Sequence, residues 1–351
     1  MDDVTAPEFD VDGNVFGCLV ASMEASAITL GHQLGLWVAL ASGRGLTADE
    51  LADTAGIHPR YAREWLEAMG CAGYLRGTPG GVFELVDGVR EVLVDPESDR
   101  YLMPMVRQAA TAAAVLRPLE AAYRSGGGVG WAEQDDDMRV AQGECNKTAL
   151  RRRLPGWIRD YLPEIASRLD GGGRVADVGS GEGWASIGLA EAFPAITVDG
   201  FDLDGPTVVR ARSNILGAGL ADRVEIHRRP LEPGATRYQL IVLAEMLHDV
   251  PDPIGVLTAA RESLADNGLV LVADMKVGEE YAAPGAEMER LMYGFSLLIC
   301  LPDAMSHQPS AATGTVFRPR ILRDYAAQAG FGTVTELDIP HDGWRFWTLA
   351  R

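Results

Sequence analysis

A glycine-rich turn flanked by carboxylates is the strongest chemical signal in the chain. Residues 175–190 begin as an apolar run that contains Asp177, pass through Gly179, Gly181 and Gly183, and continue with helical apolar spacing. Glycine lets the backbone turn sharply and approach a ligand where a Cβ would clash. Asp177 would repel a pyrophosphate beside it, so the turn favours a cationic ligand such as an amino-acid ammonium or a sulfonium centre.

A second carboxylate follows the next apolar run. Asp202 stands at the end of residues 197–201, where a carboxylate can accept hydrogen bonds from both hydroxyls of a ribose. Glycine spacing alone is also found in dinucleotide sites, but D-x-G-x-G-x-G differs from the G-x-G-x-x-G pattern of those sites. The two signals together favour a charged nucleoside ligand.

The dipeptide His248-Asp249 is the candidate for proton transfer. It follows an apolar run at residues 239–243, and ligands of open parallel sheets bind at the carboxyl ends of the strands. Histidine titrates near neutral pH and can take a proton from an attacking hydroxyl. The alternative interpretation is a loop histidine followed by an aspartate that caps a helix.

Alternating strands and helices must position these residues. This alternation is typical of a parallel α/β sheet, and the last two strands are close enough in sequence to form an antiparallel hairpin. We therefore predict a seven-stranded, Rossmann-like α/β core. The seven expected strands are residues 174–178, 197–201, 223–227, 239–243, 269–274, 333–339 and 344–350.

The first hundred residues have a different, mainly helical pattern. A long apolar helix at 16–40, a capping box at 47–50, a helix from Pro59 to about residue 73 and a turn-linked pair of short strands indicate a winged helix. Residues 44–90 hold five Arg, no Lys and seven Asp or Glu, which favours dimerisation and substrate capping over DNA binding. We expect three parts: 1–105 as the winged-helix domain, 106–170 as linking helices and 171–351 as the catalytic domain.

Composition narrows the classes of function. The chain has 351 residues with 31 Lys and Arg against 50 Asp and Glu, a net charge of −19. This charge and the pI near 4.7 argue against binding to nucleic acid or to an anionic membrane surface. We expect no membrane span and, from the acidic first residues, no signal peptide. Four well-separated cysteines indicate reduced thiols in a cytoplasmic enzyme.

The glycine turn, the acid after the second strand and the terminal hairpin resemble those of class I S-adenosylmethionine (SAM)-dependent methyltransferases. The winged helix extends the resemblance to bacterial small-molecule methyltransferases and to plant-type O-methyltransferases, which dimerise through such a domain. Related enzymes usually carry an acidic residue where this chain has Pro230. The resemblance implies SAM as cofactor, held by Asp177, Gly179, Ser180, Gly181, Gly183, Asp202, Leu203 and Leu231.

By the same resemblance we expect a homodimeric enzyme of secondary metabolism that methylates a small-molecule oxygen, with His248 as general base beside Asp249. Candidate substrate contacts are Asn146, Arg290 and Tyr293.

Two alternatives remain open at this stage. His248, Asp249 and His307 supply two imidazoles and a carboxylate, a set that can hold a divalent metal, Fe or Zn. Some related methyltransferases use such a triad to methylate the carbon next to the carbonyl of an α-keto acid. The second alternative is a transcription regulator that senses SAM.

Overall fold

The computed structural model describes residues 10–351, so the prediction about a signal peptide at the first residues falls largely outside the described part. Contacts divide the chain into two compact units, Met1–Ala113 and Ala114–Arg351. Most of the segment expected to link the domains, from residue 114 onward, is part of the second unit.

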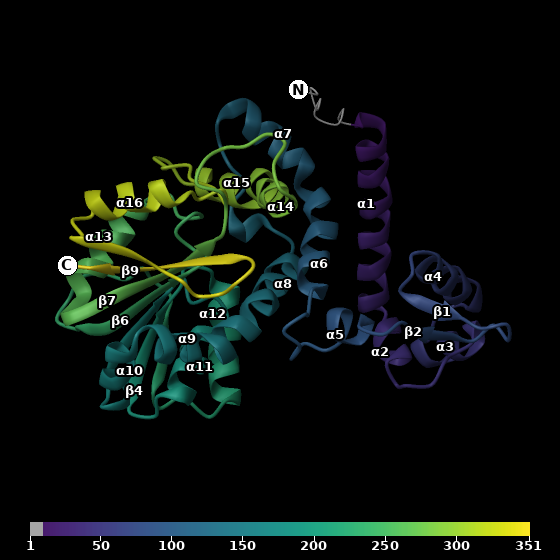
Figure 1. The fold of residues 1–351 in the computed structure, drawn as a ribbon, viewed down its shortest axis with the longest axis horizontal. Helices are drawn as coiled ribbons and strands as arrows, with labels where there is room; N and C mark the ends of the chain where they lie inside the picture. The colour runs from purple at the N-terminus through teal and green to yellow at the C-terminus, as the bar shows by residue number, and fades with distance from the viewer. Residues whose placement is uncertain (1–9) are drawn as a thin grey trace, which may run out of the picture. The chain divides into compact units, whose positions relative to one another are not determined.

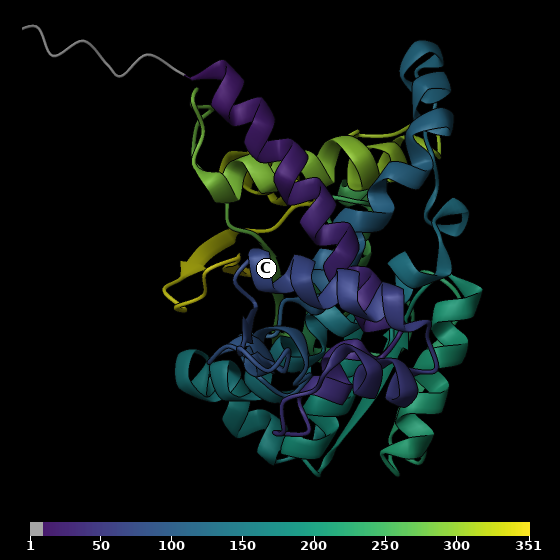
Figure 2. The same ribbon diagram turned by 90° about the vertical axis from the view of Figure 1, so that its right-hand side faces the viewer.

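The first unit is a winged helix that follows one long helix (Figures 1 and 2). Thr47 and Glu50 form the predicted capping box, and Pro59 stands at the start of α4. The described elements are α1 (Val11–Gln33), α2 (Leu36–Leu40), α3 (Ala48–Ala55), α4 (Pro59–Cys71), β1 (Leu75–Gly77), β2 (Phe83–Leu85), α5 (Val89–Leu93) and α6 (Met103–Thr111), and a 3₁₀ turn (Ala112–Val115) crosses the boundary between the units. Strands β1 and β2 pair antiparallel as the wing.

Two tryptophans centre the core of this unit. The rings of Trp37 and Trp65 meet edge to face with centroids 4.7 Å apart. Their indole nitrogens donate to the carbonyls of Ile28 and Ala27, each at 2.9 Å. A Cβ on Gly31 would lie 2.4 Å from the Trp65 ring, so glycine is required for this close approach of α1 to α4.

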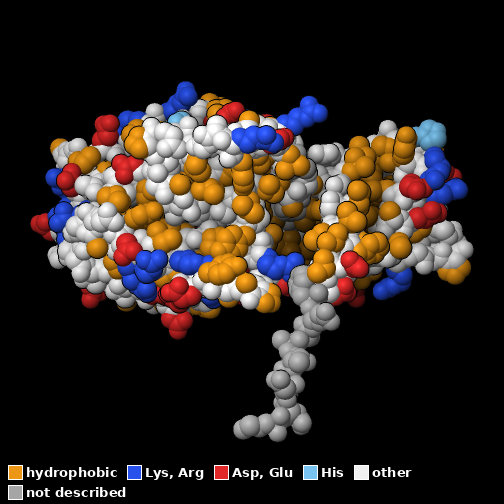
Figure 3. Space-filling model, turned by 90° about the horizontal axis from the view of Figure 1, so that it is seen from above, with side chains coloured by type: hydrophobic (Ala, Val, Ile, Leu, Met, Phe, Trp, Pro, Cys, Tyr) orange, Lys and Arg blue, Asp and Glu red, His pale blue; other side chains and the backbone are white. Residues whose placement is uncertain are grey.

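Helix α1 exposes a large part of its apolar surface. Val11, Phe16, Leu19 and Met23 are each more than half exposed. Figure 3 shows apolar side chains at the surface beside the start of the described chain. Among the described residues α1 is the one helix whose length and apolar composition would allow it to cross a membrane. Signal sequences and the core helices of soluble proteins share this length and composition.

The second unit holds a seven-stranded sheet in the order β5-β4-β3-β6-β7-β9-β8. Strands β3 to β7 are parallel and β9 is antiparallel to both of its neighbours, which confirms the predicted core and its terminal hairpin. The strands are β3 (Gly173–Val178), β4 (Ile196–Phe201), β5 (Val224–His227), β6 (Tyr238–Ala244), β7 (Leu264–Met275), β8 (Thr333–Leu337) and β9 (Trp344–Ala350).

Helices cover both faces of this sheet. Residues of α9, α10, α11 and α12 pack on one face, and residues of α13 and α16 pack on the other (Figure 1). In sequence, the helices before and between the strands of this sheet are α7 (Leu116–Ser125), α8 (Asp136–Lys147), α9 (Leu154–Tyr161), α10 (Pro163–Asp170), α11 (Trp184–Ala192), α12 (Gly205–Gly217), α13 (Pro253–Ser263) and α16 (Pro319–Gln328). A 3₁₀ turn lies at Trp131–Glu133 and a π-helical turn at Thr148–Arg153.

A further helical segment lies between β7 and α16. It comprises α14 (Glu287–Phe295), a π-helical turn (Ser296–Cys300) and α15 (Leu301–Met305). The Tyr123 hydroxyl donates to the Leu297 carbonyl at 3.0 Å, and the Val129 amide donates to the Pro302 carbonyl at 3.0 Å. These bonds tie the segment to residues 123–129 of the same unit.

Candidate active site

The glycine turn follows β3, as predicted. Gly179, Gly181 and Gly183 have φ of 72°, 51° and 82°, a region that strongly favours glycine. A Cβ on Gly179 would also lie 2.8 Å from the Cβ of Met246, which follows the adjacent strand β6. The turn and the segment after β6 therefore lie against each other at the carboxyl edge of the sheet.

Asp202 joins the turns that follow β3 and β4. Its carboxylate accepts a hydrogen bond from the Gly181 amide at 2.8 Å and another from the Asp204 amide at 3.0 Å. Burial raises its pKa, against the effect of these amides. Each carboxylate oxygen has a second lone pair, so both oxygens remain able to accept ribose hydroxyls.

Asp177 connects β3 to the first turn of α11. One oxygen of this buried carboxylate accepts from the Ser186 amide at 3.1 Å and from the Ser186 hydroxyl at 2.7 Å. Burial raises the pKa of Asp177 to about 6, and the two bonds from Ser186 limit the rise. The side chain thus fixes the helix that begins at the glycine turn.

The other predicted cofactor residues differ in exposure. Ser180 is buried, and within the described part of the chain its hydroxyl has no hydrogen-bond partner. Leu203 is 66% exposed, whereas Leu231 is buried in the cluster with Val178 and Phe201. We name the turn residues 177–183 together with Asp202 the cofactor edge.

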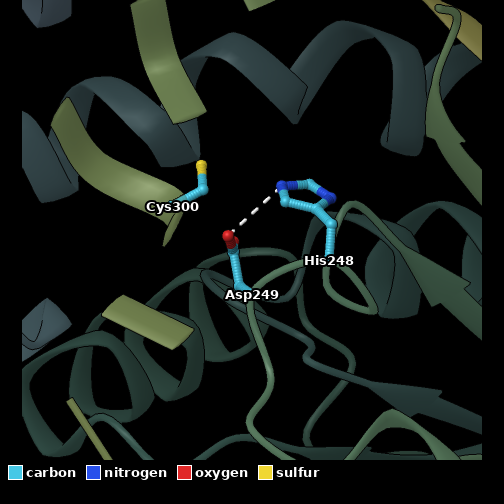
Figure 4. Close-up of side chains that lie close together, drawn as sticks. All are labelled: His248, Asp249 and Cys300. Carbon is cyan, nitrogen blue, oxygen red and sulfur yellow. Dashed lines mark ion pairs between the residues drawn. The ribbon is translucent and has the colours of Figure 1, made fainter. Parts of the chain in front are cut away.

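His248 lies buried beside two carboxylates. Its Nδ1 donates to Asp274 Oδ1 at 2.6 Å, and its Nε2 lies 3.3 Å from Asp249 Oδ1 (Figure 4). His248 is 2% exposed and Asp274 is fully buried. The bond at Nδ1 fixes the ring so that Nε2 faces Asp249. We name His248, Asp249, Asp274 and Cys300 the acceptor edge.

Asp274 is a residue that the sequence analysis did not single out. It occupies the end of the predicted strand 269–274, and the pairing of Ala244 with Ala273 brings it to the edge where His248 lies. Its place at the end of a predicted strand could have identified it from the sequence, because the carboxyl ends of adjacent parallel strands meet at one edge of the sheet.

Neighbouring charges control the protonation of His248. Burial lowers its pKa, but the carboxylates of Asp249 and Asp274 outweigh burial, so the pKa lies well above the usual value. Burial raises the pKa of Asp249, while the charge of His248 opposes that shift. Asp303, on α15, accepts the Trp131 amide at 2.6 Å, and burial followed by the Asp249 charge raises its pKa to about 7. Several carboxyl groups therefore lie near His248, and their charges favour its protonated form.

The structure does not bring the third residue of the predicted metal triad to the other two. His248 and Asp249 are joined by Cys300, and the ligand atoms of these three residues lie within 4.8 Å of one another. His307 is exposed and is not part of this group. The reason is the course of the chain: α15 ends at Met305, so His307 falls in the turn beyond it, whereas Cys300 lies on the helical segment that faces His248.

The three candidate substrate residues have separate environments. Asn146 donates to Glu245 at 2.6 Å, and Glu245 also accepts hydrogen bonds from Gln142 and from the Trp344 indole. Tyr293 accepts a hydrogen bond from Arg318 at 3.3 Å. Arg290 is exposed.

Glu245 was also missed by the sequence analysis. It directly follows β6 with a φ of 50°, an uncommon backbone conformation for a residue with a side chain. Burial raises its pKa, and the bonds from Trp344 and Asn146 oppose the rise. Its three donors come from α8 and from the β8–β9 hairpin, so Glu245 fastens both to the carboxyl edge of the sheet.

Family comparisons agree with this architecture. A family model described as a methyltransferase domain matches residues 150–336, and an Rv2258c-like winged HTH domain matches residues 22–77. A 2,7-dihydroxy-5-methyl-1-naphthoate 7-O-methyltransferase from Streptomyces carzinostaticus is 32% identical over 137 residues, which are 37% of this chain and 40% of that enzyme. The chain spans 40% to 54% of the lengths of four curated relatives that it matches.

Two solved structures share the fold over nearly the whole chain. An O-methyltransferase family protein from Burkholderia thailandensis has a TM-score of 0.73 at 17% identity, covering 98% of this chain and 99% of its own. An O-methyltransferase from neocarzinostatin biosynthesis, solved with SAM and 2-hydroxy-5-methyl naphthoic acid, has a TM-score of 0.64 at 20% identity, with the same coverage. At these identities the likeness establishes the fold.

Proposed function

The chain belongs to the methyltransferase domain family, and we propose that it transfers the methyl group of SAM to a hydroxyl of a small molecule of secondary metabolism. The observation that carries the O-methylation is the buried pair of His248 and Asp274, joined at 2.6 Å at the carboxyl edge of the sheet. SAM, when bound, supplies an electrophilic methyl group on a cationic sulfonium.

The cofactor edge fits such a ligand. Gly179 and Gly181 place no side chain at their two positions of the turn. The buried Ser180 hydroxyl between them has no partner among the described residues and can bond a ligand. The carboxylates of Asp177 and Asp202 supply negative charge beside a cation, and Asp202 retains lone pairs for ribose hydroxyls. The hydrogen-bonding groups and the negative charge of the cofactor edge both suit SAM.

At the acceptor edge, His248 takes the proton. Asp274 holds Nδ1–H, so Nε2 is the nitrogen that can take the hydroxyl proton once the ring is in its neutral form. The hydroxyl proton passes to Nε2 as the oxygen forms its bond to carbon and the bond between methyl carbon and sulfur breaks. A cation bound at the adjacent cofactor edge lowers the pKa of His248 and so favours the basic form that this step needs. Asp249 stabilises the imidazolium afterwards.

The alternative functions have less support. Metal-dependent C-methylation by His248, Asp249 and His307 lacks its third ligand, since His307 does not join the group. A DNA-binding regulator would need a basic surface, whereas residues 44–90 carry five Arg against seven Asp and Glu.

We also propose that the protein is a homodimer in the cytoplasm. Exposed apolar side chains along α1 support dimerisation, because apolar surface gains free energy when it is removed from water. Light scattering on the purified full-length protein tests this: a mass near 75 kDa, twice the 37.7 kDa of the chain, is expected. A mass of one chain at micromolar concentration would contradict it.

Turnover tests the proposed reaction. The purified protein is incubated with SAM labelled on its methyl group and with a panel of small phenols, naphthols and α-keto acids. We expect label in the ether of a hydroxylated acceptor, and activity that survives treatment with a chelator. Label found on carbon next to a carbonyl, with activity lost on chelation, would overturn the proposal in favour of metal-dependent C-methylation.

A further inference from the structure

The side chains of His248, Asp249 and Cys300 converge at the acceptor edge from two distant segments of the chain (Figure 4). Their candidate ligand atoms, an imidazole nitrogen, a carboxylate oxygen and a sulfur, all lie within 4.8 Å of one another. We infer that these three side chains bind a thiophilic divalent cation such as Zn²⁺, and that the bound ion inhibits methyl transfer.

The histidine is already oriented as a metal ligand. Asp274 accepts its Nδ1–H at 2.6 Å, so Nε2 is the nitrogen that faces Asp249, and an ion that displaces the Nε2 proton would take the lone pair. In protein metal sites a carboxylate commonly holds the second nitrogen of a ligating histidine in this manner. The orientation that makes Nε2 a base therefore also makes it a ligand.

A second observation points to a missing cation. The Oδ1 atom of Asp249 is buried. His248 Nε2 lies 3.3 Å away as an ion-pair partner, but no described donor meets Oδ1 with hydrogen-bond geometry. A buried carboxylate oxygen without a donor is costly. Coordination of an ion would satisfy this oxygen.

Charge and ligand chemistry suit zinc. Neutral imidazole, a carboxylate and a thiolate sum to −2, which balances a divalent ion. Without an ion, burial and the neighbouring Asp249 charge raise the pKa of the Cys300 thiol to about 12, so the sulfur keeps its proton at neutral pH. Binding releases that proton, and any proton on Nε2, to solvent. Nitrogen, oxygen and sulfur are the three ligand types that Zn²⁺ uses.

The present spacing is close to that of a tetrahedral site. Bonds of about 2.0–2.3 Å place the donors of a tetrahedral zinc about 3.3–3.8 Å apart. Nε2 and Oδ1 of Asp249 are 3.3 Å apart, and the whole group spans at most 4.8 Å. Movements of about 1 Å would complete three bonds. The fourth position would be open to water.

Inhibition follows because one lone pair would serve two purposes. The Nε2 electrons that accept the hydroxyl proton are the electrons that would bind the ion, so an occupied site has no base. This consequence rests on the proposed function of His248, whereas binding of the ion does not.

Cobalt titration tests the binding site directly. The chelator-treated full-length protein is titrated with Co²⁺, a visible stand-in for Zn²⁺, while the near-ultraviolet charge-transfer absorption of a cobalt thiolate is recorded. We expect one equivalent of Co²⁺ per chain with this absorption in the wild type, and its loss in both C300S and C300A. The matched control is C71S, because Cys71 is exposed in the first unit and should leave the absorption unchanged. No thiolate absorption in the wild type, or absorption that persists without Cys300, would overturn the site.

A second arm tests inhibition and separates the two proposals. Zn²⁺ should inhibit methyl transfer by the wild type and by C71S, and the concentration for half inhibition should rise at least about 10-fold in C300S. Equal inhibition of C300S and wild type would overturn the inhibitory role. Cobalt–thiolate absorption in a protein that methylates no acceptor would sustain the binding site and contradict the proposed function instead.

Discussion

The cofactor edge and the acceptor edge both carry buried carboxylates, but they satisfy them differently. Asp177 and Asp202 accept hydrogen bonds from backbone amides and a hydroxyl in or beside the glycine turn. At the acceptor edge, Oδ1 of Asp249 and Oδ2 of Asp274 are buried without hydrogen-bond partners among the described residues. The carboxylates of the first edge are satisfied by donors of the chain itself, whereas the second edge retains unmatched carboxylate oxygens around an imidazole. Substitutions at the first should therefore change affinity, and those at the second should change chemistry.

The largest expected effect is the loss of the base. In H248A the kcat should fall by about 10²–10⁴-fold, the usual contribution of a general base, while the SAM dissociation constant changes less than about twofold. Steady-state kinetics and calorimetry measure the two quantities. H307A is the control and should keep near-normal kcat because His307 is exposed and outside the group. An equal loss in H307A would favour His307 as a member of the site, as the predicted metal triad had it.

The second largest effect is expected at the cofactor edge, where a substitution should change the affinity for SAM. D202A removes a carboxylate that we expect to hold the ribose, and hydrogen bonds to a charged group contribute about 1.5–3 kcal/mol. The SAM dissociation constant should therefore rise by about 10–150-fold. D222A changes an exposed aspartate and serves as the control. Unchanged affinity in D202A, measured by calorimetry, would contradict the ribose assignment.

A third variant tests how the acceptor edge controls its histidine. In the wild type the two carboxylates raise the pKa of His248, so kcat/KM should rise with pH to an inflection above the ordinary histidine value of about 6.5. D274N removes one of these charges, which lowers the pKa of His248 and moves the inflection to lower pH. The kcat should fall by about 10-fold because the ring is less well held. An inflection that stays in place in D274N would show that Asp274 does not act on His248.

The smallest effect concerns stability. The Glu245 carboxylate accepts hydrogen bonds from Gln142, Asn146 and Trp344. In E245Q the new NH₂ group would point at one of these three donors, and that hydrogen bond would be lost. The expected loss is about 1–3 kcal/mol in the free energy of unfolding. Thermal denaturation of the second unit should show a melting temperature lower by about 2–10 °C. A melting temperature equal to that of the wild type would show that the Glu245 carboxylate does not stabilise the attachment of α8 and the hairpin to the sheet.

The cofactor edge was largely predictable because its parts are close in sequence. The residue type alone predicts a turn at Gly179, Gly181 and Gly183, and Asp202 comes directly after the next strand. What the sequence did not show is that Asp177 holds Ser186 at the start of α11, or that Leu203 is exposed. Side-chain partners depend on rotamers, which residue spacing leaves open.

The acceptor edge was predictable only in part. The dipeptide His248-Asp249 could be placed after a strand, but its partners come from β7 and from the helical segment near residue 300. His307 was predicted as the third ligand for its residue type. It lies outside the group around His248 because the helical segment ends at Met305, a point that residue spacing did not show.

The sequence by itself determined the order of strands and helices, the glycine turn and the winged helix, since these follow from apolar periodicity and from residues with restricted backbones. The tertiary structure decided which side chains meet at the acceptor edge. Asp274, 26 positions from His248, and Cys300, at the end of a π-helical turn, reach the imidazole because adjacent parallel strands end at one edge and the helical segment faces it. Contacts between distant segments depend on how strands pair and where helices end, and no local pattern of residues encodes those distances.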